Sequence, residues 1–328
     1  MRAIVYTEYG PPDVLQLAEV SKPAPKDDEV LIDIRAASVN PLDWHFMRGT
    51  PNIMRLMAGF RRPKRTRLGV DVAGQVEAVG SNVTGFRPGD AVFGTCKGAF
   101  AEYACAAERA VVLKPANVTF EQAAAVPVAA ITALQGLRDK GQIQRGQKVL
   151  INGAAGGVGT FAVQIARVFG GDVTGVCRTR NVDMVRSIGA HHVLDYTQED
   201  FTKSGQRYDL IVDTVGNHSL SDTRRALTPQ GTLVLVGGPD TGGWLGPLTD
   251  VLKVVVLSRF VSHKLRPFLA RLSNQDLIVL QQLLEAGKVT PVIDRRYPLR
   301  DVAGAIRYLE EGHARGKVVI SMEHPVNP

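Results

Sequence analysis

A glycine-rich loop between an apolar run and a helical pattern constrains the fold of this chain most. Residues 148–152 are apolar, and Asn152-Gly153-Ala154-Ala155-Gly156-Gly157-Val158-Gly159 leads from them into a helix expected over residues 158–169. Backbone N–H groups at a helix start, with no side chains to keep a ligand away, form a pyrophosphate site. A glycine triplet can also be only a tight turn, but strand, loop, helix and second strand occur here in order. The loop therefore predicts a dinucleotide site at Ala155, Gly156, Gly157 and Val158, although Ala154 replaces the first glycine of the G-x-G-x-x-G spacing.

Strand and helix patterns alternate after residue 147, whereas residues 1–118 have short β-branched runs broken by Pro and Gly. Alternation of this kind is typical of a doubly wound parallel sheet with helices on both faces, and the earlier pattern of a compact β domain. Residues 119–122 have capping-box spacing, and Pro127 should interrupt or kink the helix that follows. The tail from about residue 289 returns to β character, so we expect an α/β unit inserted into the β domain. Strands are expected at 148–152, 172–177, 192–195, 208–213, 231–236 and 316–322, and helices at 158–169, 182–188, 219–227 and 276–286.

The end of the second strand of the α/β unit indicates the cofactor. An NAD site has a carboxylate about 20 residues after the loop, at the end of that strand. This chain has Arg178, Thr179 and Arg180 there and no acid. Two arginines and a threonine can hold a 2′-phosphate by charge-assisted hydrogen bonds, so we expect NADPH rather than NADH. The alternative is that both arginines are only solvated loop cations.

The positive charge of the chain is concentrated in one segment. Lys and Arg total 39 and Asp and Glu 32, a net charge of +7. No acid occurs between Asp43 and Asp71, and this window alone holds as many cations as the whole excess. Composition permits nucleic acid, an anionic membrane face or a polyphosphate as the attracted partner. The cations of this window are Arg48, Arg55, Arg61, Arg62, Lys64, Arg65 and Arg67.

Several protein classes do not fit this composition. The longest suspicious uncharged stretch, residues 122–137, contains Pro127 and is shorter than the roughly 20 apolar residues of a membrane span. The N-terminus enters an apparent strand at once, which leaves no room for a leader. Three cysteines without CxxC spacing suit a reducing compartment and provide no disulfide framework. We therefore expect a cytoplasmic protein.

Several ordered motifs resemble the medium-chain dehydrogenase/reductase superfamily in its quinone oxidoreductase branch. They are the runs of residues 68–80, 86–94 and 98–103 and the Gly156-Gly157-Val158-Gly159 loop. The resemblance implies a GroES-like catalytic domain over residues 1–120, a Rossmann NADPH-binding domain over 121–288, and a return to the catalytic domain over 289–328. It also implies a cofactor cleft between the domains and commonly a homodimer.

The departures from this superfamily concern its metals. Zinc alcohol dehydrogenases carry a Gly-His-Glu motif where this chain has Gly69-Val70-Asp71, and Asn40 stands near the early cysteine ligand position. Three scattered cysteines also cannot build a four-cysteine zinc site. We therefore expect no metal and an acceptor that is already electrophilic, namely a quinone or an α,β-unsaturated carbonyl compound. The predicted activity is an NADPH-dependent, zinc-independent quinone oxidoreductase or enone reductase.

The resemblance also implies individual site residues. Asn40 would lie near nicotinamide and substrate, where its amide donates to the developing enolate oxygen, or it only caps a turn before Pro41. Lys317 would meet a cofactor phosphate, or it is a solvated lysine that starts a strand. The remaining positions are Trp44, His45 and Phe46 for the substrate, and Thr132, Tyr196, Val215 and Gly237 for the cofactor. The aromatic residues of the substrate group could instead only pack, Thr132 could be a helix threonine that bonds its own backbone, and Tyr196 could be a loop tyrosine without a ligand.

Other functions remain open at this stage. An enoyl-thioester reductase of the same superfamily would keep the cofactor. A nucleotide-sensing or nucleic-acid-binding protein on this fold has only the basic window in its favour, without interleaved aromatic residues, so we expect no specific nucleic acid. The basic segment, residues 48–67, either draws in the polyphosphate of NADPH, with at most peripheral membrane contact, or is a solvated loop.

Overall fold

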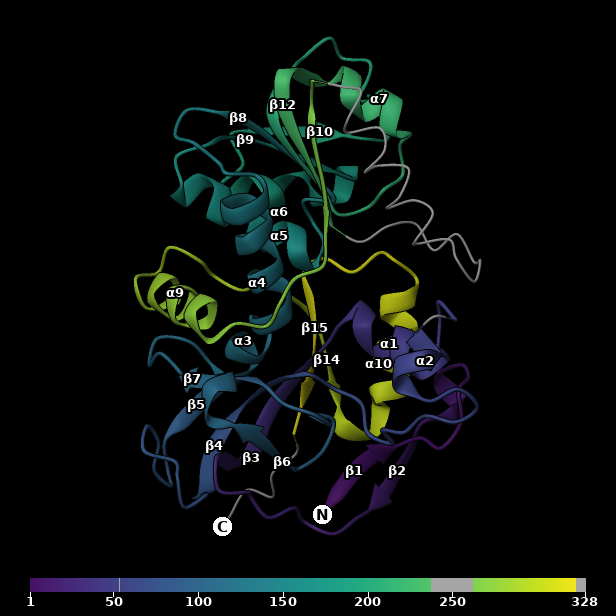
Figure 1. Ribbon diagram of the computed structural model, residues 1–328. Helices are drawn as coiled ribbons and strands as arrows, with labels where there is room; N and C mark the ends of the chain where they lie inside the picture. The colour runs from purple at the N-terminus through teal and green to yellow at the C-terminus, as the bar shows by residue number, and fades with distance from the viewer. Residues whose placement is uncertain (53, 237–261, 323–328) are drawn as a thin grey trace. The chain divides into compact units, whose positions relative to one another are not determined.

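The computed structural model describes residues 1–52, 54–236 and 262–322 of the chain. Contacts within the chain separate two compact units (Figure 1): residues 1–129 together with 272–328 form one, and residues 130–271 form the other. The second unit is therefore inserted into the chain of the first. In the described part of the chain, no helix has the length and apolarity needed to cross a membrane.

A parallel sheet forms the centre of the inserted unit. Among the described residues it has six strands in the order β10-β9-β8-β11-β12-β13, and all neighbouring pairs are parallel. The chain proceeds outward from β8 first on one side and then on the other, so the strand order reverses between β8 and β11, where doubly wound sheets bind ligands. The predicted fold class is confirmed. The strands are β8 Lys148–Asn152, β9 Asp172–Cys177, β10 His192–Asp195, β11 Tyr208–Asp213, β12 Leu227–Val236 and β13 Lys264–Phe268.

The helices of this unit bury apolar faces against the sheet. All residues from 159 to 166 of α5 are buried, and β8 is buried along nearly its whole length, as expected for a central parallel strand. Strand residues such as Leu150, Ile211 and Leu233 form one buried cluster with Phe201 and Tyr208. In the described part of this unit the α-helices are α5 Gly157–Val168, α6 Val182–Ser187 and α7 Leu220–Arg225, and α4 Pro127–Gln135 enters the unit at residue 130.

A mostly antiparallel sheet dominates the first unit. Its described strands lie in the order β14-β15-β3-β4-β5-β7, and β6 also pairs with β3. Val318 of β15 lies opposite Val39 of β3, so a strand near the C-terminus completes a sheet begun near the N-terminus (Figure 1). The strands are β3 Glu29–Val39, β4 Asp71–Val79, β5 Ala91–Thr95, β6 Tyr103–Ala107, β7 Val111–Leu113, β14 Ile293–Pro298 and β15 Lys317–Ser321, while β1 Arg2–Val5 and β2 Gln16–Glu19 form a separate pair.

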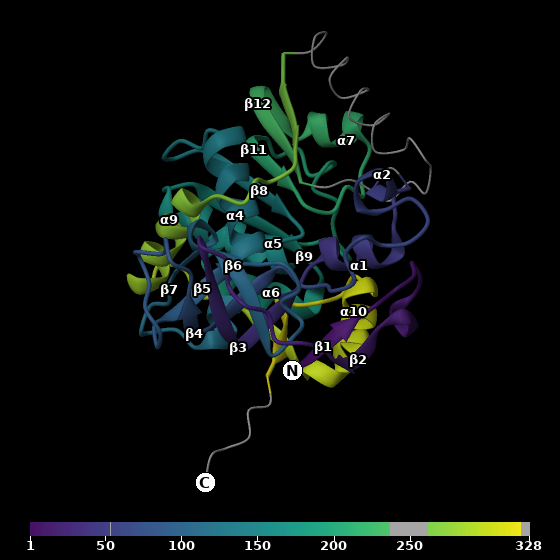
Figure 2. The same cartoon turned by 60° about the horizontal axis from the view of Figure 1, so that its bottom comes forward.

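The helices of the first unit that were not expected from the sequence include α1 Pro41–Arg48 and α10 Val302–Glu310. Proline suits the first helical position because the N–H that it lacks would have no intrahelical partner there. The turn expected before Pro41 is therefore the start of a helix. Figure 2 shows α10 beside α1, and Nε of Arg48 lies 2.5 Å from Oε1 of Glu310. The remaining helices are α2 Met54–Ala58, α3 Phe120–Ala124 and α9 Asn274–Glu285.

The capping box predicted at Thr119 is confirmed. Oγ1 of Thr119 accepts from the Gln122 N–H at 3.1 Å, and the Gln122 side chain accepts from the Thr119 N–H at 2.9 Å. α3 ends at Ala124 and a new helix begins at Pro127, so the proline interrupts the helix rather than kinking it.

The inserted unit ends earlier in the chain than the sequence suggests. We expected the return at residue 289, but the structure assigns everything from residue 272 to the first unit. The reason is α9, whose Asn274 donates to the Val111 carbonyl of β7, while Asn117 donates to the Leu284 carbonyl at 2.9 Å. Helical periodicity alone cannot show which sheet a helix covers. The unclear stretch 254–261 lies outside the described residues.

Candidate functional site

The glycine-rich loop connects β8 to α5 by a tight turn. Gly153 adopts φ 84°, a left-handed conformation that favours glycine. A Cβ at Gly159 would lie far inside contact distance of the Gly153 carbonyl oxygen, so only glycine lets the helix pack this closely on the loop. The Ala154 N–H donates to the Val176 carbonyl of β9 at 3.0 Å and ties the loop to the sheet. The turn is therefore built from backbone contacts.

The start of α5 has the properties of a phosphate site. Gly156 is the N-cap, the first turn contains no acidic residue, and Gly156, Gly157 and Val158 are all partly exposed. The first N–H groups of a helix have no intrahelical partner, and the helix dipole adds positive potential there. A Cβ at Gly156 would meet only the Gly153 oxygen, at 3.4 Å, so space is open above the backbone. This cradle fits the pyrophosphate of a dinucleotide.

The ends of β9 and β10 bring the predicted 2′-phosphate residues to one edge of the sheet. Arg178, Thr179 and Arg180 follow β9 and are all exposed. Tyr196 follows β10, its side chain is 51% exposed, and its N–H donates to the Cys177 carbonyl at 3.0 Å. The two strand ends therefore lie side by side, as a shared ribose phosphate would need.

A carboxylate that the sequence analysis did not consider also lies at this edge. Asp195 ends β10 and accepts from the N–H and the hydroxyl of Thr197 at 3.0 and 2.9 Å. A hydrogen bond from the Thr179 side chain is the main cause that lowers the pKa of Asp195, and the Thr197 bonds add to it. Oγ1 of Thr179 is also 3.0 Å from Oγ1 of Thr197. The acid therefore holds the arginine-bearing turn against β10, and its place just before Tyr196 could have revealed it.

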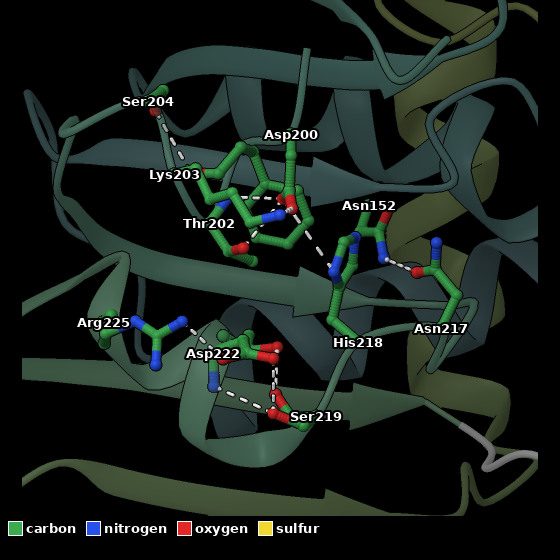
Figure 3. Close-up of polar contacts among 12 residues, drawn as sticks. Asn152, Asp200, Thr202, Lys203, Ser204, Asn217, His218, Ser219, Asp222 and Arg225 are labelled. Atoms are coloured by element: carbon green, nitrogen blue, oxygen red, sulfur yellow. Dashed lines mark hydrogen bonds and ion pairs between the residues drawn. The ribbon is translucent and has the colours of Figure 1, made fainter.

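The ends of β8 and β11 are joined by a second polar network. The Asn152 amide donates to Oδ1 of Asp213 at 2.9 Å. It also donates to Oδ1 of Asn217 at 2.9 Å, the contact drawn in Figure 3. Asp213 also accepts from the N–H groups of Val215 and Gly216 at 3.0 and 2.9 Å. Val215 itself is 49% exposed at the point where the strand order reverses.

His218 and Asp200 belong to the same edge. Figure 3 shows the imidazole of His218 directed at Asp200, with Nδ1 and Oδ1 3.9 Å apart. The ring also stands edge-on to Phe201, with centroids 4.8 Å apart. The hydroxyl and N–H of Thr202 both donate to Asp200. These contacts fix the loops beside the strand ends.

Two predicted cofactor residues are less informative. Thr132 lies on α4 and is 8% exposed, and it has a partner of its own within the described part of the chain. Gly237 lies outside the described residues.

In the first unit, Asn40 belongs to a buried polar network rather than to an open surface. It is 2% exposed, and its amide donates to Oδ2 of Asp71 at 2.9 Å and to the Ser38 carbonyl at 3.4 Å. Its Oδ1 accepts from Nζ of Lys317 at 2.5 Å. Both the nitrogen and the oxygen of the carboxamide therefore already have hydrogen-bond partners within the protein. The sequence analysis had expected the nitrogen to donate to a substrate oxygen.

Asp71 collects several donors in this network. Besides Asn40, the Ser38 hydroxyl donates to Oδ2 at 2.8 Å and the Val128 N–H donates to Oδ1 at 3.0 Å. Burial raises the pKa of Asp71, while Lys317 and these donors oppose the shift. An acid at the head of an apolar strand is the sequence signal that could have found it, because buried acids need partners.

Asp43 is the second buried carboxylate. Its two oxygens accept from the backbone N–H groups of Asn40 and Gly69 at 2.8 and 3.1 Å. Burial raises the pKa of Asp43 to about 7, the nearby Asp71 adds to the rise, and the two backbone donors and Lys317 oppose it. The network thus contains two carboxyl groups and a single ammonium.

Lys317 was predicted to contact a cofactor phosphate, but the structure places its ammonium inside the network. The residue is 3% exposed, and Nζ donates to the Val39 carbonyl at 3.2 Å and lies 3.7 Å from Oδ2 of Asp71. Burial lowers the pKa of Lys317, opposed by both carboxylates. β15 directs this side chain inward because it pairs with the end of β3.

The predicted substrate residues lie on consecutive positions of α1. The rings of Trp44 and His45 are stacked with centroids 3.7 Å apart, and Nδ1 of His45 is 2.8 Å from the Thr50 carbonyl oxygen. Trp44 and Phe46 are partly buried and pack against the core of the first unit. Part of each aromatic side chain therefore packs against the core, and part remains exposed to solvent.

Two family profiles match the sequence. The one described as an alcohol dehydrogenase GroES-like domain matches residues 26–116, and the one described as a zinc-binding dehydrogenase matches residues 188–320. The 2-methylene-furan-3-one reductase of Solanum lycopersicum is 37% identical over 99% of this chain and 79% of its own length. The chloroplastic NADPH-dependent alkenal/one oxidoreductase of Arabidopsis thaliana is 33% identical over 98% of this chain and 79% of its own.

A solved structure agrees with these relatives. The quinone oxidoreductase from Coxiella burnetii superposes with a TM-score of 0.84 at 29% identity, covering 98% of this chain and 99% of that one. The chain belongs to the medium-chain dehydrogenase/reductase superfamily. Within this superfamily it is an oxidoreductase of the quinone oxidoreductase branch, and membership of this dehydrogenase/reductase family implies a nicotinamide cofactor.

The superfamily also includes zinc enzymes, whose ligand positions carry other residues in this chain. Among the described residues, no group of three or more His, Cys, Asp or Glu side chains could hold a metal ion. Val70 and Asp71 stand where the zinc enzymes have His-Glu, and the oxygens of Asp71 are engaged by Ser38, Asn40 and Val128.

Proposed function

We propose that this member of the superfamily reduces quinones or α,β-unsaturated carbonyl compounds by hydride transfer from NADPH without a metal. The observation that carries the cofactor choice is the pair of arginines after β9. A reductase for NADH would present a carboxylate to the ribose hydroxyls at this point. Here Arg178 and Arg180 are exposed beside Tyr196, and the nearest strand-end acid, Asp195, is engaged by threonines.

The loop residues divide the binding of NADPH between them. The N–H groups at the start of α5 would hold the pyrophosphate, and the guanidinium groups of Arg178 and Arg180 would hold the 2′-phosphate with Thr179. Tyr196 would lie against the same phosphate, and Val215 would line the edge where the strand order reverses. Thr132 and Gly237 complete the proposed contacts. Bound NADPH supplies a hydride, and the protein supplies its orientation.

The acceptor must be electrophilic by itself. Val70 stands where the zinc enzymes have a histidine ligand, and Asn40, near the position of their early cysteine ligand, donates to Asp71 and accepts from Lys317. A conjugated carbonyl or quinone spreads the incoming charge onto oxygen without a Lewis acid. Because the Asn40 amide is engaged, we assign stabilisation of that oxygen to water or another donor, and we keep Trp44, His45 and Phe46 as the acceptor-side residues.

Two further expectations belong to this proposal. A homodimer is common in the superfamily, and sedimentation of the purified protein would test it. A cytoplasmic location is consistent with the three free cysteines, Cys96, Cys105 and Cys177.

A screen of NADPH oxidation tests the proposed function directly. Short-chain quinones, enones, alkenals and enoyl thioesters are offered to the protein before and after dialysis against a chelator. We expect turnover with quinones or enones that survives dialysis and is far slower with NADH. Turnover confined to enoyl thioesters would favour the alternative reductase, and activity lost with the chelator and restored by zinc would refute the metal-free reaction.

A further inference from the structure

A buried ammonium joins two distant parts of the first unit. Lys317 begins β15, and its Nζ donates to Oδ1 of Asn40 at 2.5 Å and to the carbonyl of Val39 at 3.2 Å. Oδ2 of Asp71 lies 3.7 Å away. An ammonium has three hydrogens, and these three acceptors are the groups it faces. The Lys317 ammonium is therefore surrounded by acceptors of the protein itself.

The charges around Asn40 determine which way its carboxamide points. Lys317 only donates, so it must face Oδ1 of Asn40. Oδ2 of Asp71 already accepts from the Ser38 hydroxyl and accepts the amide of Asn40, so it faces Nδ2. A rotation of the amide by 180° would bring two donors together at Lys317 and two acceptors together at Asp71. Lys317 and Asp71 therefore hold Asn40 in a single orientation.

Asn40 in turn fixes the beginning of α1. It is the N-cap residue of this helix, and its own N–H donates to Oδ2 of Asp43 at 2.8 Å. The other oxygen of Asp43 accepts from the Gly69 N–H, which anchors the first turn to the segment before β4. Trp44 and Phe46 follow within the next two turns. A chain of contacts thus leads from β15 to the aromatic residues of α1.

We propose that Lys317 is a positioning residue that, through Asn40, fixes the start of α1 and with it the acceptor-side residues Trp44 and Phe46. The inference rests on the proposed function, which assigns those residues to the acceptor. It differs from the phosphate contact expected from the sequence, because a positioning residue acts on the acceptor side and a phosphate ligand acts on the cofactor.

K317M removes the ammonium while preserving most of the side chain's length. Asp71 retains three neutral donors in this variant, from Ser38, Asn40 and Val128. Should the unpaired carboxylate prevent folding, K317M/D71N removes both charges and is tested in the same way. V319A is the matched control, since Val319 is fully buried two residues further along β15 and has an apolar side chain.

Tryptophan fluorescence provides a readout that does not depend on turnover. The chain has two tryptophans, Trp44 and Trp244, so W244F leaves Trp44 on α1 as the single emitter. In this background we expect K317M to increase quenching of Trp44 by acrylamide and to shift its emission to the red. We also expect the KM for the acceptor to rise about tenfold, because small displacements of substrate-orienting groups are costly.

Binding of NADPH measured by calorimetry separates the two roles. Positioning predicts a Kd within about twofold of the parent protein, since independent sites are nearly additive. The proposal is overturned if the Kd rises strongly and loses salt dependence while Trp44 is unchanged, or if V319A reproduces the fluorescence and KM effects. Failure of the proposed function would instead appear as a parent protein that reduces no acceptor, with the fluorescence result still readable.

Discussion

Oδ1 of Asn40 accepts a hydrogen bond from Nζ of Lys317 at 2.5 Å, across 277 positions of the chain. The two residues were expected to serve different ligands, one the substrate and the other a cofactor phosphate. Their contact makes them parts of a single buried network with Asp43 and Asp71. The role of either residue therefore has to be tested together with the other.

The Asp43 carboxyl should make the free energy of unfolding fall as the pH rises. Burial raises its pKa from 3.8 to about 7, so between these values the folded protein binds more protons here than the unfolded chain does. The stabilisation from this group is complete at low pH and is lost as the pH rises through the folded pKa. D43N cannot titrate, so the excess stability of the wild type over D43N should shrink by about 2 to 3 kcal/mol from pH 5 to pH 8.

Urea unfolding of both proteins at several pH values measures this difference. M47A is the control, because Met47 is a fully buried residue of the same helix that does not titrate, and its effect should stay constant. A difference for D43N that grew with pH would contradict the raised pKa.

The arginine after β9 should distinguish the two nicotinamide cofactors. We expect R178A to weaken NADPH binding by about tenfold or more, the scale of one charge-assisted hydrogen bond, and to leave NADH binding unchanged. Calorimetric titration of both cofactors checks this. R186A serves as the control, since Arg186 lies on nearby α6 and its side chain is 62% exposed. Equal losses for both cofactors would refute 2′-phosphate recognition.

Two glycines of the cradle should respond differently to alanine. G159A places a methyl group against the Gly153 carbonyl, so we expect a loss of stability of about 1 to 3 kcal/mol. G156A has room for the methyl group in the free protein, so we expect normal stability but weak NADPH binding, because the methyl group would occupy phosphate space. Thermal unfolding and calorimetry distinguish these outcomes, and tight NADPH binding by G156A would place the pyrophosphate elsewhere.

The basic segment should act on the rate of cofactor association. Arg61, Arg62, Lys64 and Arg65 are all exposed, and residues 44–70 contain no acid. Replacing these four cations by glutamine should slow NADPH association by about tenfold at low salt and reduce its salt dependence. Stopped-flow fluorescence measures both quantities. The control replaces four exposed cations elsewhere, namely Arg87, Lys140, Lys203 and Lys288. An equal effect in the control would show that only the net charge of the protein matters, and not the position of the basic segment.

Local patterns predicted the inserted unit well. The strands at 172–177, 192–195 and 208–213 have the predicted bounds. Two of them, β9 and β11, lie inside the sheet, where parallel strands are short apolar runs between polar turns. α1 and α10 were missed, and α9 was predicted but assigned to the wrong unit. These three helices depend on what they pack against, and a sequence pattern does not specify that partner.

The sequence by itself determined the superfamily, the dinucleotide loop and the arginines in place of a carboxylate, because each is a short motif whose chemistry depends on neighbouring residues. Only the tertiary structure decided that Lys317 faces Asn40 and Asp71, and that Asp195 holds the arginine turn. These contacts depend on the pairing of β15 with β3 and of β10 with β9. Burial determines what Lys317 can bind. The sequence alone allows a solvated lysine, but strand pairing removes the ammonium from water, so it donates to groups inside the protein.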